Sequence, residues 1–223
     1  MPTDVVGKGV NIEKLKEMYL DLLRQTKREG IEDLIAYLEN SDFFEAPAST
    51  IYHGSFPGGL VLHSLNVYNA LQFHYWNLKA SNEFSFPDIP EDSMIIVALC
   101  HDLCKVNTYH PTWRNKKVYS DRGSKQDAGG RFDWEVVQSY ERKPLFAMGH
   151  GGKSLFILQQ FIHVTPTEAA AIFWHMGPYD ISAYTTLNEL GQTYTDNLLA
   201  FLLYQADMTS TYIHENENYV LNK

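Results

Sequence analysis

The stretch Met94-Ile-Ile-Val-Ala-Leu-Cys-His-Asp-Leu-Cys-Lys105 decides how this chain folds. Seven apolar residues in succession lead directly into the pair His101-Asp102. A helix that is apolar on every side is buried among other elements. Ser93 is a residue type that caps helix N-termini. The stretch therefore predicts a buried helix from Met94 to about Lys105, with polar chemistry near its end.

Helical spacing recurs on both sides of this stretch. Before it, Ile12, Leu15, Tyr19, Leu22 and Leu23 share one helix face, Gly30 is placed to end that helix, and a second begins near Leu34. Thr165-Pro166-Thr167-Glu168 is a capping box with Pro at the first helical position. The remaining pattern predicts helices from Gly59 to about Leu78, about Gly152 to Phe161, Pro166 to about Met176 with a stop at Gly177, and about Thr195 to Ile213, with a loop over 81–92.

The segment 106–149 has a different character. Trp113, Val118, Phe132 and Trp134 lie in short β-prone runs around a Gly- and charge-rich middle, which predicts a small two-stranded hairpin or flap. With no linker or internal repeat, we expect one all-α domain carrying this insertion. Its N-terminal helices, within 1–45, would pack on a core formed by 46–223.

Composition excludes several classes of protein. The 223 residues are 44% hydrophobic and 13% aromatic, as in globular proteins, and the formal net charge of −9 disfavours binding to duplex nucleic acid. The two cysteines, Cys100 and Cys104, cannot form a disulfide framework. No run is long enough to span a membrane, and the first six residues lack a signal pattern. We therefore expect a soluble cytoplasmic protein with no membrane partner.

Polar residues stand at or near the ends of five apolar stretches. Burying an ionised carboxylate without a partner costs several kcal/mol, and Lys105 is the only cationic residue within four positions of Asp102, with none that near Asp207. A divalent metal would satisfy both carboxylates. Each histidine alone is more often a hydrogen-bonded core residue, and each aspartate alone a solvated or capping one. Together they form a candidate metal set: His63, His101, Asp102, His150, His175 and Asp207.

The order of these residues resembles the H…HD…D pattern of the HD-domain metal-dependent phosphohydrolase superfamily. The flanks agree, because Gly58–Leu65 resembles a "GGLLxHTL" helix start and residues 101–105 fit "HDxxK". The resemblance covers about residues 46–213 and implies an all-helical HD core. It also implies one metal held by His63, His101, Asp102 and Asp207, with Asp102 bridging to a second metal held by His150 and His175.

The implied activity is hydrolysis of a phosphomonoester or phosphodiester by metal-activated water, with Asp102 or a histidine steering the water. Mixed His and carboxylate ligands suit one or two Mn, Fe, Ni or Zn ions. Lys105 would hold substrate phosphate as a point charge, if it is not simply a solvated helix end. Lys153 and Arg114 are further candidate phosphate contacts. His53 is a candidate substrate group, although a loop histidine usually faces water.

The substrate is expected to be a nucleotide or another small phosphate ester. Too few residues precede the core for the nucleic-acid-binding barrel of the exoribonuclease branch, and Gly177-Pro178-Tyr179 departs from the cyclic-dinucleotide branch. The run 114–131 carries local charge +4 and aromatic neighbours, which indicates either a flap that closes over a base or a solvated loop.

Other interpretations stay open. Gly151-Gly152-Lys153-Ser154 resembles the end of a P-loop, but position 147 is Ala where that motif needs Gly. A non-catalytic ligand-binding HD module and a di-iron oxygenase on the same fold are alternatives to the hydrolase. Cys100 and Cys104 fit small core residues better than sulfurs near a metal. The oligomeric state is left open.

Overall fold

The computed structural model describes residues 11–81, 85–180 and 186–216. The N-terminal hexapeptide, residues 82–84 of the loop predicted over 81–92 and the last seven residues lie outside these ranges. The helices are α1 (Ile12–Gln25), α2 (Ile31–Glu39), α3 (Gly59–Ser81), α4 (Glu91–Cys100), α5 (His150–Leu158), α6 (Pro166–Trp174), α7 (Leu187–Asp196) and α8 (Leu198–Thr209). Short 3-10 turns cover Leu103–Lys105 and Gly177–Asp180, and a π-helical turn covers Ser210–His214.

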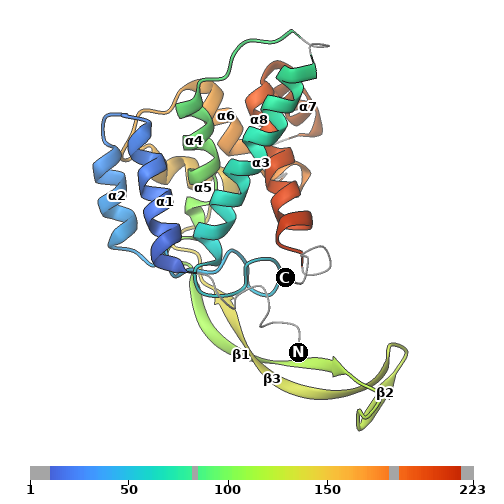
Figure 1. The fold of residues 1–223 in the computed structure, drawn as a ribbon. Coiled ribbons are helices and arrows are strands. Elements are labelled where there is room, and N and C mark those ends of the chain that lie inside the picture. The colour runs from blue at the N-terminus through green and yellow to red at the C-terminus, as the bar shows by residue number, and fades with distance from the viewer. Residues whose placement is uncertain (1–10, 82–84, 181–185, 217–223) are drawn as a thin grey trace.

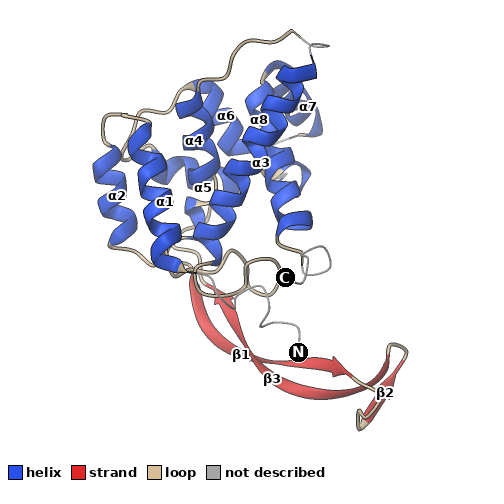
Figure 2. Ribbon diagram, in the orientation of Figure 1, coloured by secondary structure: helices blue, strands red, loops and turns tan. Residues whose placement is uncertain are grey.

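The strands form a long arm outside the helical body. Strands β1 (Tyr109–Tyr119), β2 (Lys125–Asp127) and β3 (Gly130–Arg142) make an antiparallel sheet of order β1-β3-β2. Figure 2 shows this sheet extending away from the helices, and we call residues 109–142 the arm. The prediction of an all-α fold with a small two-stranded hairpin is therefore wrong: the fold is mixed, although mostly helical. The Gly-rich middle read as a loop contains β2, which turns back through Ala128-Gly129 to pair with β3.

Helix α4 lies at the centre of the helical body, as its apolar sequence predicts. Every residue from Ser93 to Cys100 is buried, and α4 packs against α1, α3, α6 and α8. Figure 1 shows α3 and α8 beside one another, and contacts between them confirm this neighbourhood. The Tyr19 hydroxyl of α1 donates to the Leu99 carbonyl at 2.8 Å, which ties the N-terminal helices to the core.

Several helix boundaries differ from the sequence predictions. Helix α4 begins at Glu91 and its N-cap is Pro90, not Ser93. It stops at Cys100, because the backbone of Asp102 (φ −108°, ψ 19°) leaves the helical conformation. Asn197 separates α7 from α8 and caps α8, so the last helix starts later than Thr195. Helix α6 has the predicted capping box but ends at Trp174, before Gly177.

Gly30 does not end the first helix. Helix α1 ends at Gln25, and Gly30 instead caps the start of α2 with φ +84°. A Cβ atom at this position would lie 1.9 Å from the Phe161 carbonyl oxygen. Only glycine fits both the left-handed backbone and this close approach.

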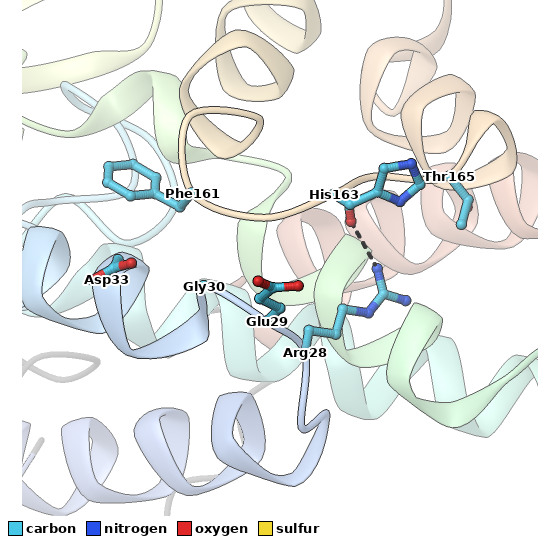
Figure 3. Close-up of a pocket in the computed structure, with 7 residues that line it drawn as sticks. All are labelled: Arg28, Glu29, Gly30, Asp33, Phe161, His163 and Thr165. Atoms are coloured by element: carbon cyan, nitrogen blue, oxygen red, sulfur yellow. Dashed lines mark hydrogen bonds between the residues drawn. The ribbon is translucent and has the colours of Figure 1, made fainter.

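Arg28, between α1 and α2, joins three parts of the helical body. It lines a small pocket with Phe161 and His163, and Figure 3 shows it donating to the His163 carbonyl, at 3.5 Å. Its guanidinium also contacts Asp92 at 2.8 Å and Glu168 Oε2 at 2.8 Å. Glu168 is fully buried and belongs to the capping box of α6. The guanidinium of Arg28 is thus already bonded to Asp92, Glu168 and the His163 carbonyl. We therefore interpret Arg28 as a structural residue.

Candidate metal centre

His63, His101, Asp102, His150, His175 and Asp207 meet at one place, which we call the metal centre. They come from α3, the end of α4, α5, the end of α6 and α8. Five of the six are buried, and His150 is half-buried. Subsets of these residues offer nitrogen and oxygen atoms that lie within 4.8 Å of one another and could hold a metal ion.

The end of α4 explains how two adjacent residues reach the same centre. Neighbours on a continuous helix diverge by about 100°. The helix stops at Cys100, however, and His101 Nε2 lies 3.4 Å from Asp102 Oδ2. The departure from helical geometry at Asp102, which the sequence did not predict, therefore turns both side chains inward.

The buried imidazoles present their inner nitrogens to the centre. His101 Nδ1 donates to the Ala98 carbonyl at 2.8 Å, and His175 Nδ1 donates to the Ile172 carbonyl at 2.7 Å. Each Nε2 is thereby left as the nitrogen that faces inward. In the part of the chain that the structure describes, the buried Nε2 of His175 has no hydrogen-bond partner. Backbone carbonyls that fix the tautomer in this way are typical of histidines that bind metals.

Asp102 stands between two groups of ligands. Its Oδ2 lies 3.6 Å from His63 Nε2 and 3.4 Å from His101 Nε2. Its Oδ1 lies 2.7 Å from His150 Nε2 and 3.7 Å from His175 Nε2. The two oxygens of one carboxylate thus face different histidine pairs, which is the arrangement that bridging of two metals requires.

Lys105 forms an ion pair with Asp102. The sequence left open whether Lys105 is instead a solvated helix end. It is buried, not a solvated helix end, and its Nζ lies 2.5 Å from Asp102 Oδ2. Burial favours the neutral acid, but Lys105 and His101 hold the pKa of Asp102 well below its usual value. Asp102 is therefore an anion, and Lys105 supplies part of its counter-charge.

Charge is also balanced around Asp207. Its Oδ1 lies 3.2 Å from His63 Nε2. Although burial opposes ionisation of both groups, the hydrogen bond from His63 lowers the pKa of Asp207. Burial likewise lowers the pKa of His63, yet Glu215 and Asp207 together raise it to about 10. A metal ion bound at Nε2 of His63 would replace the ring proton that these carboxylates favour.

Sequence reasoning missed Glu215, which fixes the orientation of His63. Glu215 is buried, and its Oε1 accepts from His63 Nδ1 at 2.9 Å and from Asn66 Nδ2 at 3.1 Å. The π-helical turn after α8 carries it toward His63. The spacing held a signal, since residues eight apart can fall within one helical stripe and Glu215 follows Asp207 by eight residues, but the predicted helix ended at Ile213.

His53 also lies at the centre, contrary to the expectation that it faces water. It is half-buried, its ring centroid is 5.0 Å from that of His63, and its buried Nε2 lacks a hydrogen-bond partner among the described residues. Burial, together with the nearby His63 and Lys105, lowers its pKa to about 4. Its imidazole is therefore neutral at physiological pH. No periodic pattern marked it, because it lies in a loop.

The metal centre opens into a cavity of about 1230 Å3. Asp102, His150 and Asp207 line it on one side, and Arg114 lines it from the arm. Lys153 is not among its lining residues: it is buried, with Nζ 5.2 Å from the Phe146 ring centroid. Its placement gives no support to a contact with substrate.

The two cysteines have separate surroundings. Cys100 is buried in the hydrophobic core, as its interpretation as a small core residue implies. Cys104 is buried too, but its Sγ lies 3.3 Å from His150 Nδ1. Cys104 therefore touches a residue of the metal centre from the outside.

The fold and the site define a class: a mostly helical protein with a buried His/Asp centre that could hold metal, set beside a β arm. Within the described ranges, no helix is long and apolar enough to cross a bilayer. Comparison with protein-family models, curated proteins and solved structures found no match. The HD resemblance accordingly rests on the residues themselves.

Glu215→Gln tests whether the outer contact of His63 matters for metal. The amide keeps an acceptor for His63 Nδ1 but removes the negative charge. We expect metal affinity, measured by competition with a chromogenic chelator, to fall by about 10- to 100-fold. Glu141→Gln, an exposed carboxylate on the arm, is the matched control. Equal affinities for the two variants would show that Glu215 does not support a metal ligand.

Proposed function

We propose that this protein is a metal-dependent phosphohydrolase of the HD type, acting on a small phosphate ester such as a nucleotide. The observation that carries the proposal is the orientation of the centre. Buried histidines tied outward by Nδ1 present Nε2 to two aspartates, and this centre opens into a cavity with cationic residues. The motif order and flanks described above support the same class.

The donor set fits a divalent transition metal. It combines imidazole nitrogens with carboxylate oxygens, which suits Mn, Fe, Ni or Zn, and the buried Nε2 of His175 lacks a partner in the described ranges. His63, His101, Asp102 and Asp207 would hold one ion, and Asp102, His150 and His175 a second. A bound ion supplies Lewis acidity and makes water more acidic.

The surrounding side chains would perform the remaining work. Lys105, charged and beside Asp102, keeps that carboxylate ionised and adds positive potential where a phosphate would enter. The neutral ring of His53 offers an imidazole nitrogen to orient a hydroxyl or a water by hydrogen bonding. Arg114 on the arm would hold the anionic substrate in place. Positioning and charge stabilisation of this kind are the main protein contributions to phosphoryl transfer.

The decisive experiment combines metal content with turnover. The full chain is stripped with chelator, reloaded separately with Mn, Fe, Ni or Zn, and assayed on p-nitrophenyl phosphate, bis(p-nitrophenyl) phosphate and a nucleotide panel. We expect about one or two ions per chain and turnover only in the presence of metal. His163→Gln, which changes an exposed histidine outside the centre, should match the parent.

Other results would point elsewhere. Full metal occupancy with no phosphate release on the whole panel would overturn the hydrolase and favour a non-catalytic binding module. Oxygen uptake by the iron-loaded protein with a polyol, without phosphate release, would favour the oxygenase. Failure to bind any of the four metals would overturn the proposed chemistry altogether.

A further inference from the structure

The arm contributes a cationic wall to the cavity above the metal centre. Arg114 and Lys116 on β1 and Arg142 at the end of β3 all line the cavity that also contains Asp102, His150 and Asp207. Alternate residues of a strand point to the same face, so Arg114 and Lys116 lie on one side of β1. Figures 1 and 2 show the arm leaving the lower end of the helical body, below α1 and α3 as drawn.

Ion-pair partners for these three cations are absent from the described residues. Among the described residues, no acidic side chain lies within ion-pairing distance of Arg114, Lys116 or Arg142, and the buried Nε of Arg114 has no hydrogen-bond partner. Glu135 pairs with Lys116 across the strands through the backbone register, yet forms no ion pair with it. Lys117, the next residue along, is different: its Nζ lies 2.5 Å from Asp127 Oδ2.

Such an arrangement needs an explanation in this protein. The formal net charge is −9, so acidic residues are abundant, and yet three cationic side chains face one cavity with no ion-pair partner in the part of the chain that the structure describes. A buried guanidinium nitrogen without an acceptor is costly unless a ligand supplies one. The metal-binding side of the cavity is anionic and the arm side is cationic. With metal ions bound on the first side, two anionic groups of one ligand could be held at once, one at the metals and one at the arm.

The size of the cavity agrees with such a ligand. Sites for drug-sized molecules usually occupy about 300–1,000 Å3, and this cavity measures about 1230 Å3. A single phosphate group would leave most of it empty. Tyr109 and Tyr140 also line the cavity and offer apolar ring surface to the same ligand.

We propose that Arg114, Lys116 and Arg142 form a second anion subsite, so that the substrate is a phosphate ester bearing a second phosphate group. This inference rests on the proposed function for what happens at the metals. The subsite itself is a binding property of the arm. One phosphate would lie at the metals for hydrolysis. The other would bind the arm subsite, where it would select the ligand and fix its position in the cavity.

Binding measurements can test the subsite without relying on turnover. Isothermal titration calorimetry at low salt would compare adenosine 3′,5′-bisphosphate with adenosine 5′-monophosphate and adenosine 3′-monophosphate, each as its non-hydrolysable phosphonate analogue, on the metal-loaded full chain. We expect the bisphosphate to bind at least about 10-fold more tightly than either monophosphate. In Arg114→Met/Lys116→Met this preference should disappear. The matched control is Arg122→Met/Lys125→Met, which removes two exposed cations of the same arm outside the cavity lining.

The outcomes separate the two proposals. The subsite is overturned if the parent shows no preference for the bisphosphate, including no binding at all, or if both double variants lose the preference equally. A circular dichroism melt that matches the parent checks that each variant is folded. If the preference depends on Arg114 and Lys116 but the metal-loaded protein hydrolyses no phosphate ester, the subsite stands and the proposed hydrolase fails.

Discussion

Asp102→Asn is expected to abolish metal binding and phosphate-ester hydrolysis together. The change removes the charge and replaces one oxygen by an NH2 group. Because Oδ1 faces His150 and His175 while Oδ2 faces His63 and His101, the amide nitrogen must replace a ligand atom on one side. Elemental analysis should show metal falling from about one or two equivalents to near zero, and kcat/KM should fall by at least ~10³-fold.

The loss of Asp102 must be separated from a failure to fold. Lys105 would be left buried without its carboxylate, and breaking a buried ion pair commonly costs about 3–5 kcal/mol. Asp102→Asn/Lys105→Met removes that isolated charge and should regain stability in a thermal melt without regaining metal. Asp133→Asn, an exposed carboxylate of the arm, should resemble the parent. Retention of both metal and turnover by Asp102→Asn would refute the assignment.

Arg28→Met is expected to give the largest loss of stability away from the metal centre. Methionine preserves much of the volume of the side chain but leaves the fully buried Glu168 without its cation. Uncompensated buried charges of this kind cost about 3–5 kcal/mol, and we expect about 3 kcal/mol because Arg28 keeps 15% of its side chain exposed. For a chain of this length that lowers the melting temperature by roughly 6–12 °C.

A second arginine on the same helical hairpin provides the control. Arg24 pairs with Glu32, but their side chains are 48% and 66% exposed, so Arg24→Met should change the melting temperature little. Arg28→Met/Glu168→Gln should recover part of the loss by removing the isolated charge. If Arg28→Met melts no earlier than Arg24→Met, the Arg28–Glu168 contact does not stabilise the fold.

The same pair has a defined dependence on pH. Burial raises the pKa of Glu168, but hydrogen bonds from Arg28, Ser93 and Thr165 outweigh it and lower the pKa from 4.5 to about 2. A carboxyl whose pKa is depressed in the folded state contributes stability that is complete above about pH 4.5 and is lost as the pH falls through about 2. The difference in stability between the parent and Arg28→Met should therefore shrink over this range in acid melts.

Much of the helical body could be predicted because its cause is local. The capping box at Thr165 and Glu168, the helix from Gly59 and the burial of the run 94–100 follow from residue type and spacing. The arm was underestimated because its strands alternate charged and aromatic residues that do not build a core. Strands β1 and β3 are 11 and 13 residues long and are stabilised by pairing with each other. The sequence of either segment alone does not show this pairing.

Residue types and spacing identify the six histidines and aspartates that end apolar runs and that must be buried, but they do not identify Glu215. How these groups are used depends on the folded chain. The break at Asp102, the contact of Glu215 with His63, the inward position of His53 and the pairing of Lys105 with Asp102 all join segments distant in the chain or depend on a departure from helical geometry. Hydrophobic periodicity records which face of an element is buried, whereas the direction of a charged group depends on the electrostatic partners that folding brings to it.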